Sequence, residues 1–103
     1  MNFNEYQSEA SNVRLPSAGP MYALFGLSGE VGELHSLIAK AIRDGRTYSY
    51  DHNIKKELGD VLWFISAIAA DHGFTLEEVA IANINKLKDR KDRGTLQGSG
   101  DNR

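Results

Sequence analysis

Residues 55–64 read KKELGDVLWF, and the apolar side chains in this stretch decide the fold of the 103-residue chain. Val61 and Phe64 begin a run of apolar residues at helical spacing, which predicts an amphipathic helix over about residues 54–72. At about 100° per residue, both side chains fall within about 40° of Glu57 around the helix axis. The sequence therefore places an acidic side chain inside the apolar seam of a helix.

A second stretch, GLSGEVGEL at residues 26–34, places acids in the same way on an earlier helix. In each stretch one acid falls within the apolar stripe and a second acid, three residues later, falls at its edge. An ionised carboxylate in such a seam needs a partner, and four converging carboxylates cannot neutralise one another. Hard oxygen ligands suit Mg²⁺ or Mn²⁺. The sequence therefore predicts a metal site with the ligands Glu30, Glu33, Glu57 and Asp60. The alternative is that these acids are solvated on helix faces, as most acids are.

Helical periodicity predicts an all-α fold, since no segment alternates with period two for long enough to indicate a strand. Thr75 and Glu78 form a capping-box pattern at the start of the last helix. Glycines follow the later helices, as is common at helix C-termini. The predicted helices span about residues 3–13, 21–44, 54–72 and 75–93, with a polar loop at 45–53 that contains two tyrosines.

The domain organisation is expected to be simple. Residues 1–94 form one all-α catalytic domain, and the glycine-rich segment 95–103 is a flexible tail. The net charge is −2 with both signs interspersed, so neither a nucleic-acid polymer nor a membrane is expected as a partner. The longest apolar run, 61–70, is about half as long as a membrane-spanning helix needs. The chain has no cysteine, so disulfides and thiolate metal sites are excluded, as suits a reducing compartment. We expect a soluble cytoplasmic protein.

A file of polar and basic side chains on the last helix predicts a phosphate-binding surface. Asn83, Lys86 and Arg90 fall on one narrow stripe, and amide, ammonium and guanidinium groups all bind phosphate oxygens. The alternative is a solvated basic end that stabilises the helix dipole. Lys40 and Phe64 lie seven residues beyond Glu33 and Glu57 and point toward the same predicted cavity, so both are predicted to bind the substrate, as candidates for recognition of the base. Carboxylates that hold a divalent ion beside phosphate-binding cations are the components of metal-assisted attack on a phosphoanhydride.

These motifs resemble those of the MazG-type nucleoside triphosphate pyrophosphohydrolases, an all-α superfamily with the signature ExxE, a spacer, then ExxD. Here the two motifs are EVGE at 30–33 and ELGD at 57–60, and the flanking NEYQ, TLEEVA and NINKLKDR segments also match. The resemblance implies a four-helix MazG-like bundle completed by oligomerisation. It also implies Mg²⁺-dependent cleavage of an NTP or dNTP between the α and β phosphates, giving NMP and pyrophosphate.

The resemblance also assigns roles to residues. Glu30, Glu33, Glu57 and Asp60 match the Mg²⁺ ligands, and Asn83 and Lys86 match phosphate contacts, with Arg90 a weaker match. Glu33, at the wetter edge of its helix, is our choice for the base that takes a proton from the attacking water.

The VLWF segment bears on assembly, because the helix that contains it is apolar or small on nearly every side. Such a helix needs partners on every side, and Trp63 points away from the core-facing arc. We therefore expect a homo-oligomer, either a dimer or a dimer of dimers. The alternative is that Trp63 packs beneath the tyrosine loop or the N-terminal segment.

Three other functions fit parts of the pattern. A non-catalytic helical homodimeric adaptor would keep the scaffold without turnover, but the presence of all four acids argues against it. A phosphoribosyl-ATP pyrophosphohydrolase is a sibling within the superfamily. A di-iron bundle would need Glu-x-x-His motifs, which neither acid pair supplies. The preferred base and sugar do not follow from the sequence.

Overall fold

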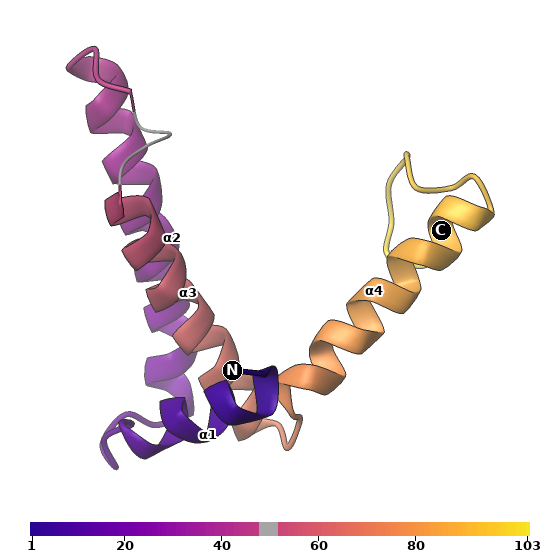
Figure 1. The fold of residues 1–103 in the computed structure, drawn as a ribbon, viewed down its shortest axis with the longest axis horizontal. Helices are drawn as coiled ribbons and strands as arrows, with labels where there is room; N and C mark the ends of the chain where they lie inside the picture. The colour runs from indigo at the N-terminus through magenta and orange to yellow at the C-terminus, as the bar shows by residue number, and fades with distance from the viewer. Residues whose placement is uncertain (48–51) are drawn as a thin grey trace.

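The structure is a computed structural model that describes residues 1–47 and 52–103. These residues form four helices and no strand, which confirms the predicted all-α class. The two tyrosines of the predicted 45–53 loop lie outside the described residues. The helices are α1 (Phe3–Asn12), α2 (Pro20–Arg43), α3 (His52–Asp71) and α4 (Leu76–Asp92) (Figure 1).

Local sequence signals set the ends of the helices. Pro20 begins α2, where a missing amide hydrogen removes no helical hydrogen bond. The predicted capping box of α4 is confirmed: Thr75 Oγ1 accepts from the Glu78 amide at 3.0 Å, and Glu78 Oε2 accepts from the Thr75 amide at 3.4 Å. Gly73 ends α3 with φ +77°, a conformation that favours glycine over other residues.

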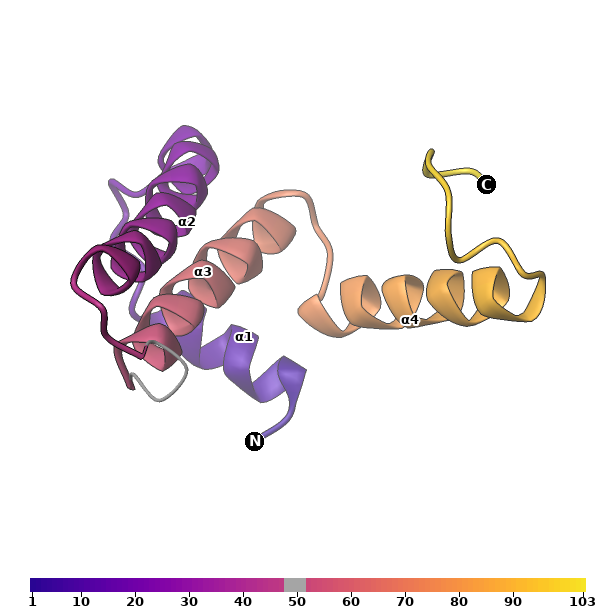
Figure 2. The same ribbon diagram turned by 90° about the horizontal axis from the view of Figure 1, so that it is seen from above.

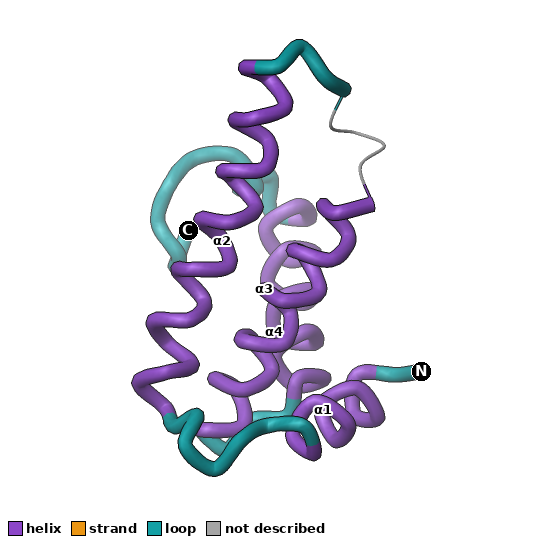
Figure 3. The backbone as a smooth tube through the Cα atoms, turned by 90° about the vertical axis from the view of Figure 1, so that its left-hand side faces the viewer, coloured by secondary structure: helices purple, strands orange, loops and turns teal. Residues whose placement is uncertain are grey.

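The helices α2 and α3 run antiparallel and side by side, forming a helical hairpin (Figure 3). Its core contains Ala23, Phe64 and Ala67, all buried. Gly26 allows the close approach, because a Cβ atom added there would lie 2.1 Å from Cε1 of Phe64. The predicted apolar seam is thus the contact between the two helices that carry the acid motifs.

The first helix crosses the lower end of the hairpin and covers part of α3 (Figure 1). Trp63 Nε1 donates to the carbonyl oxygen of Ala10 in α1 at 3.2 Å. Trp63 therefore packs beneath the N-terminal segment, which was the alternative interpretation, and it gives no support for an oligomer. Arg14 fixes the linker after α1 through a two-point ion pair with Asp71, at 2.8 and 3.0 Å.

The last helix leaves the hairpin (Figures 1 and 2). It contacts α1 and α3 but, within the described part of the chain, not α2. Gln7 of α1 holds its start, since Oε1 accepts from the Leu76 amide at 2.9 Å and Nε2 donates to the Phe74 carbonyl at 3.1 Å. The radius of gyration is 16.5 Å, whereas about 13 Å is typical of a compact domain of this length. The single chain is therefore extended.

The segment after α4 turns back toward that helix (Figure 1). Arg103 donates to the carbonyl oxygens of Thr95, Leu96 and Gly100, which ties the segment into a loop. The flexibility expected of residues 95–103 stays a prediction. No helix in the described ranges is long and apolar enough to cross a membrane.

Candidate metal and nucleotide site

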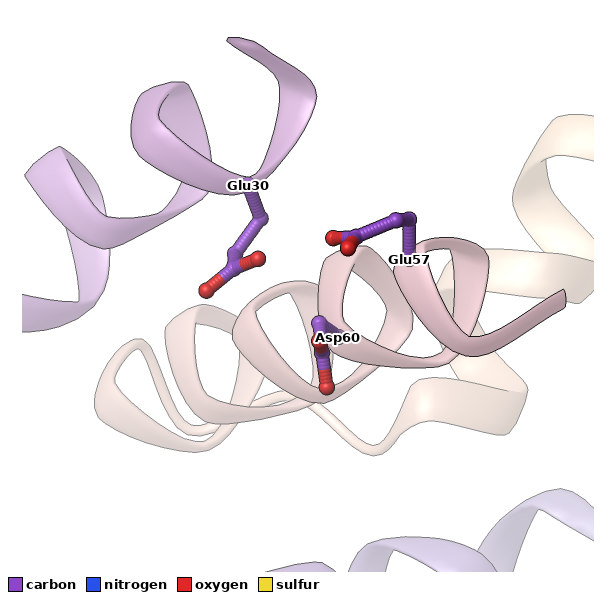
Figure 4. Close-up of side chains that lie close together, drawn as sticks. All are labelled: Glu30, Glu57 and Asp60. Atoms are coloured by element: carbon purple, nitrogen blue, oxygen red, sulfur yellow. The ribbon is translucent and has the colours of Figure 1, made fainter. Parts of the chain in front are cut away.

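Three carboxylates meet across the hairpin. Because α2 and α3 run antiparallel, Glu30 of α2 faces Glu57 and Asp60, which lie one turn apart on α3 (Figure 4). One carboxylate oxygen from each residue lies within 4.8 Å of the others. Glu30 and Glu57 are half-buried and Asp60 is exposed, as their places in the seam and at its edge predict.

The cluster is electrostatically unfavourable without a cation. Burial raises the pKa of Glu30, and the charges of Asp60, Glu57 and Glu33 raise it further. A side-chain hydrogen bond with Glu57 acts in the same direction, since it favours the protonated form of Glu30. Within residues 1–47 and 52–103, no lysine or arginine forms an ion pair with any of the three clustered acids.

The donor set fits a hard divalent cation. Carboxylate oxygens are the ligands that Mg²⁺ and Mn²⁺ prefer, and Mg²⁺ in nucleotide enzymes commonly uses one or two carboxylates plus substrate phosphates. Three carboxylates within 4.8 Å, with no lysine or arginine partner among the residues that the structure describes, have the composition of such a site. Their mutual repulsion would be relieved by the ion.

Glu33 is not part of this group of three. It lies one turn after Glu30 on α2 and is exposed. It is near enough for its charge to raise the pKa of Glu30. The structure thus brings together three of the four predicted metal ligands and leaves the fourth beside them.

A cavity of about 360 Å³ adjoins the acids. Glu30 and Asp60 line one part of it, and Tyr22, Trp63 and Phe64 supply aromatic surface. The other wall is the linker after α1, including Val13, Arg14, Leu15, Ser17 and Ala18. Sequence reasoning treated this linker only as a connection; its two prolines, which restrict the path of the backbone, were the available signal.

The predicted substrate residues on the hairpin have different surroundings. Phe64 lines the cavity but is only 7% exposed, because its ring packs in the core with Trp63 edge-on at 5.0 Å between ring centroids. Lys40 is exposed on α2 and lies outside the lining of the cavity. It is ten residues beyond Glu30, which is about 15 Å along a helix.

The predicted phosphate contacts on α4 lie apart from the acids within one chain. Asn83 and Lys86 line a separate cavity of about 560 Å³ with Phe74, Glu78, Val79 and Ala82. Arg90 is buried at 5% exposure against Asp101. The expectation that these residues and the acids face one pocket is therefore not met in a single chain. The physical reason is that α4 turns away from the hairpin after Gly73.

One further side chain near the acids comes from α1. Burial raises the pKa of Tyr6, and the charge of Asp60 raises it further. The tyrosine hydroxyl therefore lies within electrostatic reach of the cluster. Tyr6 belongs to the NEYQ segment that resembles the family.

Comparison with known proteins agrees with the geometry. The family model described as the MazG nucleotide pyrophosphohydrolase domain matches residues 21–95, which contain both acid motifs. The Gene 37 protein of Mycobacterium phage L5 is 39% identical over 114 aligned residues, covering all of both chains. The crystal structure of iMazG from Vibrio DAT 722 is similar with a TM-score of 0.61 and 29% identity, over 85% of this chain and 97% of that one. The chain therefore belongs to the MazG nucleotide pyrophosphohydrolase family.

Proposed function

We propose that this protein is a Mg²⁺-dependent nucleoside triphosphate pyrophosphohydrolase that splits an NTP or dNTP between the α and β phosphates. The products are the nucleoside monophosphate and pyrophosphate. The observation that carries the proposal is the group of three carboxylates within 4.8 Å on the two helices that bear the family motifs. Mn²⁺ has the same preference for oxygen ligands and is expected to substitute.

Glu30, Glu57 and Asp60 hold the divalent ion in this proposal. When bound, the ion neutralises charge on the triphosphate and acidifies the attacking water. Glu30 and Glu57 fix the position of the ion, because both are half-buried in the contact between α2 and α3. Asp60 is exposed and faces the cavity, where the phosphates would approach.

Glu33 is the proposed general base and an additional ligand. Its carboxylate is exposed and stands beside the cluster rather than within it, so it remains free to accept a proton from water. Its charge contributes to the raised pKa of Glu30, which supports a role for Glu33 beside the proposed metal ligands.

The nucleoside is proposed to lie in the adjoining cavity. Tyr22, Trp63 and Phe64 provide apolar and aromatic surface against which a base can pack. Arg14 is held by Asp71 and by the Ala18 carbonyl at 2.7 Å, so the linker wall of the cavity is fixed before substrate arrives. Phe64 belongs to the aromatic side of the cavity, while Lys40 stays a proposed contact that this cavity does not explain.

The proposal includes a homo-oligomer in which α4 of one subunit contributes its phosphate contacts to the acid cluster on the α2–α3 hairpin of another subunit. Support comes from the extended shape of the chain and from apolar side chains left exposed on α2 and α4, such as Phe25 at 71% and Ile81 at 53%. A second copy would cover these faces and bring Asn83, Lys86 and Arg90 to the acids. Multi-angle light scattering gives the number of subunits.

Subunit complementation tests that arrangement. E57Q and K86A, each inactive alone, are mixed and allowed to exchange subunits. If the phosphate contacts act across the interface, a dimer regains about a quarter of wild-type activity, because half of the dimers are mixed and each has one intact site. If both residues serve the same subunit, mixed dimers regain nothing.

The hydrolase itself is tested with a panel of canonical and modified NTPs and dNTPs, with phosphoribosyl-ATP included. Each substrate is incubated with Mg²⁺ or Mn²⁺, and pyrophosphate and orthophosphate are assayed separately. Pyrophosphate and a monophosphate in equal amounts support the proposal, and orthophosphate alone rejects cleavage between the α and β phosphates. Absence of turnover with every substrate would favour the non-catalytic adaptor.

A further inference from the structure

The C-terminal segment 95–103 engages the basic stripe of α4. Lys86 Nζ lies 3.0 Å from Asp101 Oδ1, and Arg90 Nη2 lies 3.2 Å from the same oxygen. Arg90 Nη2 also donates to the carbonyl oxygen of Asp101. Arg93 donates to the Arg103 carbonyl at 2.7 Å, which adds a second point of attachment.

In these contacts one carboxylate, that of Asp101, pairs with two cations, Lys86 and Arg90. The guanidinium of Arg90 is almost fully buried by the segment, while Lys86 remains part of the wall of the 560 Å³ cavity. A carboxylate that accepts from an ammonium and a guanidinium makes the same charge-assisted bonds as a phosphate oxygen. Hydrogen bonds from Lys86 and Arg90 also depress the pKa of Asp101, which favours its ionised form.

We propose that the C-terminal segment is an intramolecular competitor of the substrate: Asp101 occupies Lys86 and Arg90 until the triphosphate displaces it. The inference rests on the proposed function, which names Lys86 and Arg90 as phosphate contacts and a triphosphate as the displacing anion. It makes the tail a regulator of access to the phosphate contacts, rather than an inert extension of α4.

The contact is built to be reversible. The Asp101 side chain is 80% exposed and that of Lys86 is 41% exposed, and an ion pair between exposed side chains contributes little to stability. Gly98 and Gly100 lie within the segment, just before Asp101, with φ of +106° and +91°, which lets the chain turn sharply without a side-chain clash. A polyanion carrying several phosphate oxygens would therefore outcompete a single carboxylate.

The test measures binding of inorganic tripolyphosphate to the full chain without a divalent ion, so that turnover plays no part. Isothermal titration calorimetry compares wild type, D101N and D89N. The control Asp89 pairs with Arg93 on the same helix, where its Oδ2 lies 2.8 Å from Nε, so the loss of charge is matched. We expect D101N to bind roughly two- to fivefold more tightly than wild type, the range for losing exposed ion pairs, and D89N to match wild type.

Backbone NMR provides the second readout. Tripolyphosphate should shift the amide signals of Gly100 and Asp101 in wild type, and K86A should weaken both the binding and the shift. Equal affinity of wild type and D101N, equal tightening in D101N and D89N, or unchanged tail signals on saturation would overturn the inference. Tighter binding by D101N together with no pyrophosphate release from the wild-type protein would instead reject the hydrolase and leave the competitor in place.

Discussion

The substitution E57Q separates a metal site from a merely structural acid cluster. Glu57 lies within 4.8 Å of Glu30 and Asp60, so removing its charge removes two repulsive pairs. At that distance a pair of unit charges repels by about 1 kcal/mol in water and about 3.5 kcal/mol at an effective dielectric constant of about 20. Because Asp60 is exposed, the lower figure is the better guide. The metal-free E57Q protein should therefore be about 1–2 kcal/mol more stable than wild type.

The assay is thermal unfolding at pH 7 with and without Mg²⁺. A gain of 1 kcal/mol corresponds to about 4–8 °C for a domain of this size. Saturating Mg²⁺ at about 100 times its Kd would stabilise wild type by about 2.7 kcal/mol, and this increment should be largely lost in E57Q together with pyrophosphate release. E9Q removes the charge of an exposed acid on α1 and should change none of these quantities.

The result that would refute the reasoning is specific. If metal-free E57Q were less stable than wild type and kept the full response to Mg²⁺, the carboxylates would not form a cation site. Full turnover in E57Q would reject the proposed mechanism as well.

Three other predictions concern the hairpin and its contacts. G26A should lower the free energy of unfolding by about 1–3 kcal/mol in urea denaturation, because its Cβ would overlap the Phe64 ring, whereas G29A faces open space and should be neutral or slightly stabilising. Q7A should cost about 1–2 kcal/mol and increase amide exchange in the first turn of α4, since two hydrogen bonds are lost. Because the pKa of Glu30 is raised from 4.5 in the folded metal-free protein, the folded state binds more protons than the unfolded state above pH 4.5. The free energy of unfolding should therefore fall as the pH rises from 4.5 through the raised pKa of Glu30. E30Q should reduce this dependence of stability on pH. If E30Q had the same pH profile of stability as wild type, Glu30 would not be the group responsible.

The helices and the acid cluster were predictable because both depend on local periodicity. Apolar spacing places Glu30 and Glu57 in the seam, and an antiparallel pair of helices then brings them together. Glu33 was predicted to join this cluster because its position in the sequence gives its direction around the helix axis. That position does not tell whether a side chain at the edge of the apolar stripe reaches the acids of the other helix.

The position of α4 was not predictable from the same signals. Periodicity identifies a face of a helix but does not say which neighbour covers it, and the Gly73–Thr75 connection allows several directions. Gln7, which holds the start of α4, is a polar residue distant in sequence. The tail shows the same limit, since its glycine content indicates mobility while its contacts depend on particular pairs such as Arg90 and Asp101.

The hairpin also has a kinetic consequence, because both halves of the acid cluster lie on helices that are consecutive in sequence. Contacts between neighbouring elements form early in folding, since closing a short loop is entropically easier than closing a long one. Carboxylate repulsion would then oppose the first step of folding rather than the last. A divalent ion should consequently speed refolding in stopped-flow experiments, and E57Q should refold quickly with or without it.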